Sequence, residues 1–156
     1  GQLHTCALTS AGAAYCWGWN DDGRIGDGNV GVDRRNAPVA VSMPAGVTFA
    51  SISAGYSHTC ALTSAGVAYC WGENDDGEIV DGNYMDRITP VTVRMPSGVT
   101  FTSINSGDEY TCALTSAGAA YCCGHNNWGK LGVGDGINRN TPVEVRMPTG
   151  VTFASI

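Results

Sequence analysis

The sequence predicts an all-β protein made of three four-stranded antiparallel blades of the propeller type, which together form an incomplete ring. The first observation is a repeat: HTCALTSAGVAYCWG at 58–72 recurs as HTCALTSAGAAYCWG at 4–18 and as YTCALTSAGAAYCCG at 110–124. The second is that each period of 52 to 54 residues holds four strand candidates and no apolar pattern of helical spacing. Strand repeats of this length are typical of propeller blades.

The repeated stretch reads as a β-hairpin. Its arms are rich in Thr, Tyr, Trp and Cys, and the turn SAG at 10–12 ends in glycine, which suits a three-residue hairpin turn. This turn sets a register in which Cys6 faces Cys16, with Leu8 on the same face and Tyr15 on the other. Both faces are largely apolar, so each hairpin must pack between two neighbours.

The register brings two cysteines of each hairpin face to face. Directly opposed residues on antiparallel strands are close enough for a disulfide, so we predict one within each hairpin. The predicted pairs are Cys6 with Cys16, Cys60 with Cys70, and Cys112 with Cys122. Disulfides persist in oxidising compartments, and the repeated pairing therefore predicts an extracellular, secreted protein. The alternative is three pairs of reduced, buried cysteines that pack as small apolar side chains.

The remainder of each period supplies the other strand candidates. After the first hairpin come a polar, Gly-rich loop at 20–28, an alternating run at 38–43, a Pro-x-Gly turn at Pro44 and a strand-like VTFASI at 47–52. The same parts recur in the second and third periods. The expected blade repeats are 1–54, 55–106 and 107–156.

Composition and charge exclude several classes of function. The net charge is −6 with eight scattered Lys and Arg, which argues against a nucleic-acid partner. No stretch approaches the apolar length of a membrane span, and none resembles a signal peptide, so we expect no membrane insertion. The chain starts at Gly1, so we expect either that a leader has been removed or that the chain is an excerpt of a longer one.

The motif that combines HTCALTSAG, YCWG and NDDGRIGDGN resembles the repeat of the regulator-of-chromosome-condensation family, and its cysteine-paired form is similar to repeats in secreted bacterial proteins. The resemblance covers all three periods and implies four-stranded propeller blades, usually seven to a ring. Ile25 and Ile79 stand where Leu is usual in the family. Val80 replaces a Gly, and Cys123 stands where the first two periods have Trp. The family includes nucleotide exchange factors, light sensors and β-lactamase inhibitors, so the fold implies no single activity.

Three blades leave two apolar end faces uncovered, because propellers close with about four to eight blades. The chain ends where a period ends, since the last six residues, 151–156, repeat 47–52. A second copy's Gly1 placed after Ile156 would restore the pattern with two residues missing. Three outcomes follow: a six-blade ring of two chains, an open filament of chains joined head to tail, or a longer closed propeller.

Cys123 is the odd cysteine of the seven. The register places it on the face opposite Cys112 and Cys122, in the position of the missing Trp. One interpretation is a small buried residue with a free thiol. A second is an intermolecular disulfide between chains. A strained bridge to Cys122 is the third.

The Asp-rich loops superficially resemble calcium loops. The candidate ligands are Asn20, Asp21, Asp22 and Asp27 in the first loop, and Asn74, Asp75, Asp76, Glu78 and Asp81 in the second. The third loop, NNWGK at 126–130, lacks carboxylates at the matching places. We therefore favour turn chemistry over calcium, since Asn, Asp and Gly supply loop conformations. No metal and no cofactor is predicted.

The loops at 19–37, 73–89 and 125–141 differ most between the periods. They carry aromatic residues and arginines, the types enriched where proteins meet partners. The predicted partner-binding residues are Trp19, Arg34, Arg35, Tyr84, Met85, Arg87, Trp128 and Lys130. Loop drift without a partner explains the same differences.

Two functions follow from these features. The first is a secreted, disulfide-linked structural unit whose chains assemble head to tail. The alternative is a protein-binding module, of inhibitor or adhesin type, within a longer seven-bladed propeller. No catalytic Ser/His/Asp or Cys/His arrangement can be placed, and we interpret His4 and His58 as hydrogen-bonding strand residues, so an enzyme is not expected.

Overall fold

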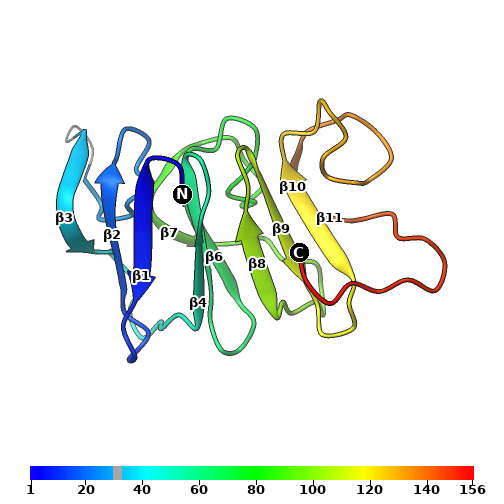
Figure 1. Cartoon of the computed structure of the whole chain (residues 1–156), viewed down its shortest axis with the longest axis horizontal. Coiled ribbons are helices and arrows are strands. Elements are labelled where there is room, and N and C mark those ends of the chain that lie inside the picture. Colours follow the sequence, from blue (N-terminus) through cyan, green and yellow to red (C-terminus); the bar gives the residue numbers. More distant parts are fainter. Residues whose placement is uncertain (30–32) are drawn as a thin grey trace.

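The computed structural model describes residues 1–29 and 33–156, and these residues form eleven β-strands and no α-helix (Figure 1). None of the described segments is a helix with the length and hydropathy of a membrane span. The strands are β1 His4–Leu8, β2 Ala14–Trp19, β3 Arg34–Ala40, β4 Ser51–Ala54, β5 His58–Leu62, β6 Ala68–Gly72, β7 Arg87–Thr92, β8 Ser103–Ser106, β9 Tyr110–Leu114, β10 Ala120–Gly124 and β11 Arg139–Glu144.

The strands form three antiparallel sheets that stand side by side along the long axis of the molecule (Figure 1). The first sheet is β1-β2-β3, the second β4-β5-β6-β7 and the third β8-β9-β10-β11, each in chain order. The first strands β4 and β8 contact each other, and β1 contacts β4. This all-β arrangement of consecutive, unclosed blades is the one that the sequence predicts.

The hairpin register is also confirmed. Cys6 pairs with Cys16 and Leu8 with Ala14, and the hairpins β5-β6 and β9-β10 have the same register. Gly12 closes the first turn with a φ of 78°, a conformation that costs little only for glycine. A Cβ there would lie 2.8 Å from the Phe49 carbonyl oxygen, so the turn also needs the space that glycine leaves.

The sheets begin one strand earlier than the expected units 1–54, 55–106 and 107–156. The period assigns VTFASI at 47–52 to the end of the first unit, but its last two residues belong to β4, in which Ser51 pairs with Leu62 of β5. The connection that follows β4 is a tight turn, in which the Gly55 N–H donates to the His58 carbonyl at 2.8 Å, so β4 pairs with the next hairpin. The first sheet consequently has three strands, and 151–156 belongs to no sheet.

An apolar core fills each junction between neighbouring sheets. The first junction, between the first and second sheets, is built around Ile25, Phe49 and Trp71. The second junction, between the second and third sheets, contains Phe101 and Cys123 in the corresponding places. These cores explain why both faces of the repeated hairpin are apolar.

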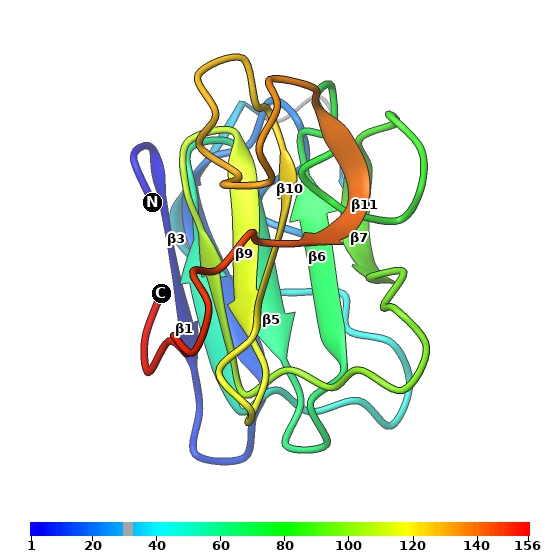
Figure 2. The same ribbon diagram turned by 90° about the vertical axis from the view of Figure 1, so that its right-hand side faces the viewer.

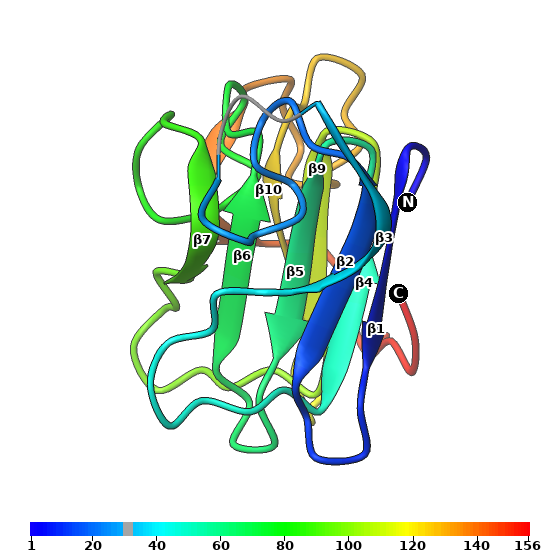
Figure 3. The same ribbon diagram turned by 90° about the vertical axis from the view of Figure 1, so that its left-hand side faces the viewer.

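The two ends of the blades differ. The three hairpin turns lie at one end, and the three long connections, β2-β3, β6-β7 and β10-β11, lie at the opposite end (Figure 2). We call the second end the loop end; its described residues are 20–29, 33, 73–86 and 125–138. Figure 3 shows the outer face of the first sheet, opposite the third sheet seen in Figure 2.

Candidate functional site: sheet junctions and loop end

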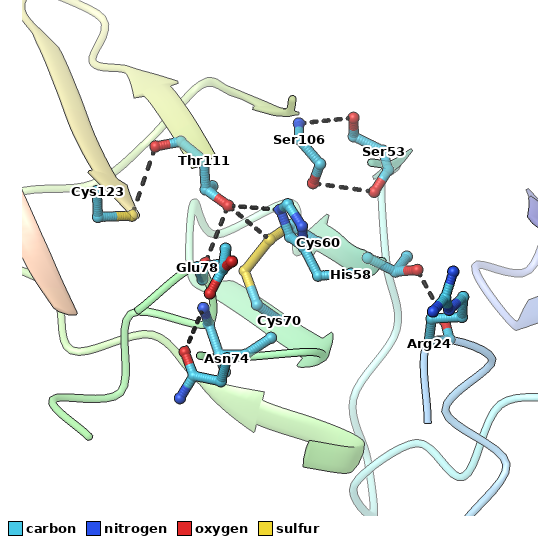
Figure 4. The surroundings of a disulfide bond; sticks show 12 residues. Arg24, Ser53, His58, Cys60, Cys70, Asn74, Glu78, Ser106, Thr111 and Cys123 are labelled. Carbon is cyan, nitrogen blue, oxygen red and sulfur yellow. Dashed lines mark hydrogen bonds between the residues drawn. A yellow bond between two sulfur atoms is a disulfide. The ribbon is translucent and has the colours of Figure 1, made fainter. Parts of the chain in front are cut away.

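The structure joins the two cysteines of each hairpin in a disulfide. The three bonds are Cys6–Cys16, Cys60–Cys70 and Cys112–Cys122. The Cys60–Cys70 bond is fully buried beside the second junction (Figure 4). Each bond ties the two strands of a repeated hairpin together; in the four-stranded second and third sheets these are the two central strands.

A hydrogen-bond relay crosses each junction. At the second junction the Nε2 of His58 lies 2.9 Å from the Thr111 hydroxyl, which donates in turn to the carbonyl of Glu78 at 3.0 Å (Figure 4). Because the hydroxyl has one proton to give, His58 must donate its Nε2–H to it. His4 and Thr59 repeat this relay at the first junction, with a distance of 2.7 Å. The histidines are therefore strand residues that hold neighbouring blades together.

Burial keeps both histidines neutral. It lowers the pKa of His58 to about 4, with a smaller contribution from the Arg24 guanidinium. It also lowers the pKa of His4 to about 3, assisted by the amino terminus and by Arg24. The neutral ring supplies the donor of the relay when its single proton is on Nε2.

The two junctions differ where Trp71 and Cys123 occupy the same strand position. Trp71 is fully buried, stacks on Phe49 and donates its indole N–H to the carbonyl of Arg24 at 3.0 Å. Cys123 is buried as well and directs its thiol to the carbonyl of Thr111 at 3.4 Å. Burial raises the pKa of this thiol, which keeps it protonated and unreactive. The structure thus gives Cys123 as a free, buried thiol, and this burial argues against its use in an intermolecular disulfide.

The polar loops hold themselves together from within. In the first loop the Asn20 side chain accepts the N–H of Ile25 at 3.1 Å, and Asn74 and Asn126 do the same in the other two loops. Asp27 pairs with Arg35, and the corresponding pairs of the later loops are Arg87 with Asp81 and Arg139 with Asp135. This arrangement is the turn chemistry that the sequence favours over calcium.

The predicted partner-binding residues all come from the loop end or its adjoining strands, but they differ in how free they are. Arg35 and Arg87 are committed to the ion pairs inside their own blades. Lys130 lies 5.4 Å above the Tyr110 ring. The side chains of Trp19, Arg34, Tyr84, Met85 and Trp128 are exposed. Residues 30–32 of the first predicted loop lie outside the described residues.

Sequence analysis missed three side chains that meet at the loop end. Asp76, Glu109 and His125 come from different segments, and one ligand atom of each lies within 4.8 Å of the others. Of the three, only Asp76 was considered in the sequence, as a candidate calcium ligand of its own loop, because Glu109 and Asp76 lie 16 and 49 positions before His125 along the chain.

The burial of Glu78, a candidate calcium ligand by sequence, is a second feature that the sequence did not reveal. Its side chain is 2% exposed, and burial raises its pKa to about 8, with help from the nearby Asp76 carboxylate. The folded protein therefore keeps a proton on Glu78 between about pH 4.5 and 8, whereas the unfolded chain has lost it. The stabilising contribution is complete below pH 4.5 and is lost as the pH rises through 8.

We expect Glu78→Gln to remove the loss of stability that the wild type shows as the pH rises through 8. The amide resembles the protonated acid, so the variant should exceed the wild-type free energy of unfolding by about 5 kcal/mol at pH 9 and by less than about 1 kcal/mol at pH 5. Urea denaturation at both pH values measures the difference, with the exposed Glu144→Gln as control. An equal effect of Glu78→Gln at pH 5 and pH 9 would contradict the assignment.

Consecutive antiparallel blades with shared junction cores define this chain as a set of β-propeller repeats. The model of the Regulator of chromosome condensation (RCC1) repeat matches residues 11–62, 65–114 and 117–156. The chain belongs to the RCC1 repeat family.

Relatives and solved structures agree with this assignment. The chain is 33% identical over 142 residues to the ultraviolet-B receptor UVR8 of Arabidopsis thaliana, covering 91% of this chain and 32% of UVR8. It is 31% identical over 134 residues to the human probable E3 ubiquitin-protein ligase HERC4, covering 85% of this chain and 12% of HERC4. Prp20p of Saccharomyces cerevisiae superposes with a TM-score of 0.84 at 23% sequence identity, and the match covers 96% of this chain and 38% of the Prp20p chain. Human WBSCR16 superposes with a TM-score of 0.80 at 19% sequence identity, and the match covers 94% of this chain and 36% of the WBSCR16 chain. The chain thus spans about a third or less of the length of the curated relatives named here.

Proposed function

We propose that this chain is a non-enzymatic, protein-binding module of an RCC1-type propeller, and that its partner meets the loop end. The observation that carries the proposal is the contrast between buried repeats and exposed loops. Trp71, in the repeated hairpin, is fully buried, whereas Trp128, in a variable loop, is 87% exposed. Tyr84 and Met85 of the neighbouring loop are 52% and 65% exposed.

Large apolar side chains gathered at such exposure are typical of binding surfaces. Trp and Tyr in particular carry much of the affinity when a partner covers them. The rigid turns beneath them, held by Asn74 and Asn126, keep these side chains in place before binding. Prp20p, which is described as binding Gsp1p and histones, is built on the same fold, so the fold is compatible with protein recognition.

Affinity capture with the immobilised chain tests the proposal. We expect the triple variant Tyr84→Ala, Met85→Ala and Trp128→Ala to lower the affinity for a captured protein at least about tenfold, because each truncation removes a hot-spot type of contact. The control replaces exposed residues at the hairpin end: Ser10, Ser64 and Ser116 by Ala. Unchanged affinity of the triple variant, with its fold intact by circular dichroism, would refute the loop end as the binding surface.

We also propose that further RCC1-type blades cover the outer faces of the first and third sheets, and that a second copy of this chain, joined head to tail, supplies them. Phe49 and Phe101 are each 3% exposed because they pack on Tyr69 and Tyr121 of the next blade. The third member of the series, Phe153, is 37% exposed. Tyr15 of the first sheet is 38% exposed. Each inner junction contains a Phe–Tyr contact. Phe153 and Tyr15 are the corresponding phenylalanine and tyrosine at the two ends of the chain, where each lacks its partner ring.

The mass of the chain in solution tests this second proposal. We expect oligomers by light scattering, and we expect Phe153→Ser to shift them towards monomers, since the substitution removes the aromatic contact. Ile137→Ser, also an exposed apolar position but at the loop end, is the matched control. A monomer at all concentrations would refute assembly through these faces and leave blades of a longer polypeptide as their cover.

We infer that the protein works in an oxidising, extracellular compartment. The three intra-hairpin disulfides support this inference, because such bonds are rare where thiols are kept reduced. Thiol titration of the native protein with and without denaturant tests it. One reactive thiol per unfolded chain is expected, and seven would overturn the inference.

A further inference from the structure

We infer that Asp76, Glu109 and His125 form a binding site for a divalent transition-metal ion of the zinc class, at the loop end of the second junction. Asp76 lies in the β6-β7 loop, Glu109 in the turn before β9, and His125 directly after β10. Their ligand atoms all lie within 4.8 Å of one another. One imidazole nitrogen and two carboxylates from three separate segments converge on one point.

The His125 ring nitrogen is the strongest indication. Its Nδ1 is buried and makes no hydrogen bond, although it lies 2.9 Å from a Glu109 carboxylate oxygen. A buried nitrogen without a partner is unfavourable, and a cation between it and the carboxylate would satisfy both groups. The backbone fixes this approach, because the His125 N–H donates to the Glu109 carbonyl at 2.8 Å.

The Asp76 carboxylate is oriented from outside the trio. Its Oδ1 accepts a hydrogen bond from the Asn138 side chain at 2.6 Å. Metal-binding carboxylates are commonly positioned by such a donor in the surrounding shell. The Lys130 ammonium, 3.4 Å from the Glu109 carboxylate, is the cation that a metal ion would displace. It already lies over the Tyr110 ring, which offers it a favourable position without Glu109.

The first junction has the same frame without the site. There the Glu73 N–H donates to the Ser57 carbonyl, as His125 does to Glu109, so Ser57 and Glu73 occupy the places of Glu109 and His125. The carboxylate of that junction, Asp22, is neutralised by an ion pair with Arg24.

At the second junction the place of Arg24 is taken by Glu78, a buried residue that supplies no positive charge. Asp76 forms no ion pair with any described residue of the chain. The second junction has therefore lost the cation of the first and gained an imidazole. Both changes favour a bound metal ion.

The donor set selects the class of ion. Zinc and related first-row ions accept mixed imidazole and carboxylate ligands at about 2.0–2.2 Å, with water in the open position. Four ligands at this distance lie about 3.4 Å apart, so ligand atoms up to 4.8 Å apart would move together by as much as about 1.4 Å, and the His125–Glu109 pair at 2.9 Å would move apart by about 0.5 Å. Calcium prefers six to eight oxygen ligands and would not use the imidazole, so the site should discriminate against it.

A zinc titration against a chromophoric chelator, on the oxidised protein at pH 7.5, tests the inference. We expect one saturable site in wild type and an affinity at least about tenfold lower in His125→Gln and in Asp76→Asn. Glu73→Gln, at the corresponding place of the first junction, should bind as wild type does. Cys123→Ser should also leave the affinity unchanged, which separates the site from the free thiol.

Three results would overturn the inference. They are the absence of a saturable zinc site below about 100 µM, unchanged affinity in both His125→Gln and Asp76→Asn, and equal competition by calcium at the same concentration. Circular dichroism of each variant shows whether a lost site reflects a lost fold. If His125→Gln fails to fold, the Asp76→Asn variant and the histidine ring signals in a zinc titration by NMR decide the outcome.

Discussion

Reduction of the three disulfides is expected to lower the free energy of unfolding by about 8 kcal/mol, enough to unfold much of the protein at ambient temperature. Each bond joins cysteines ten positions apart and closes a short loop, for which the chain-entropy estimate is about 2.7 kcal/mol per bond. The contributions should add because each bond lies in a different blade. Urea denaturation with and without a thiol reductant measures the loss.

Two variants separate the disulfides from other effects of reduction. Replacing Cys60 and Cys70 by Ala should cost about 3 kcal/mol, one third of the full effect, and should leave the other two bonds sensitive to reductant. Cys123→Ala removes a thiol without removing a disulfide, so its free energy of unfolding should respond to the reductant as the wild type does. If the reductant changes the wild type by less than about 1 kcal/mol, the disulfides do not stabilise the fold.

The sequence was sufficient to predict the hairpins and their register because both depend on local chemistry. The turn glycine, Gly12, and the alternation of Leu8, Cys6 and Tyr15 concern residues within one hairpin, where contacts follow from spacing. The same reasoning indicated blades, since a hairpin that is apolar on both faces needs two neighbours.

The partner of a strand is harder to predict than its existence. Nothing in VTFASI at 47–52 states whether it completes the blade before it or begins the blade after it. The structure assigns it to the following blade through the tight turn at Gly55. A period in the sequence fixes the length of the repeat but not the residue at which a blade starts.

Contacts across a junction could not be predicted either, because they join residues that are far apart in the sequence. Asp76, Glu109 and His125 are remote in sequence, and only the stacking of the second and third sheets brings them together. Conversely, Arg35 and Arg87 were predicted to face a partner, yet the structure pairs them with Asp27 and Asp81 of their own loops. An arginine looks the same in a sequence whether it is satisfied internally or free.

Val80 and Cys123 are two departures from the repeat that the sequence shows separately and the structure brings to one place. At the first junction Gly26, with a φ of 76°, lies against Trp71, and a Cβ on Gly26 would come 2.5 Å from the indole nitrogen. At the second junction Val80 holds the same left-handed conformation, with a φ of 65°. Val80 and Cys123 line one small apolar cavity of about 10 Å³. The valine thus occupies space that a tryptophan fills elsewhere.

Cys123→Trp alone is therefore expected to destabilise the protein by about 3 kcal/mol or more, because the indole must overlap the Val80 side chain. Val80→Gly alone should cost about 1 kcal/mol, since the lost apolar burial is partly offset by relief of the left-handed strain of a β-branched residue. The double variant should recover to within about 1 kcal/mol of wild type. In it the new indole N–H can donate to the Glu78 carbonyl, as Trp71 does to that of Arg24.

A double-mutant cycle by urea denaturation measures the coupling, which we expect to be about 3 kcal/mol in favour of the double variant. Gly26→Val is the reciprocal control: it places a valine against an existing tryptophan and should destabilise the first junction as Cys123→Trp destabilises the second. Additive effects at Val80 and Cys123 would show that the two sites are independent and that each tolerates its change separately. A coupling of the expected size would mean that the second junction exchanged a Gly–Trp contact for a Val–Cys contact as a unit, because either change alone is unfavourable.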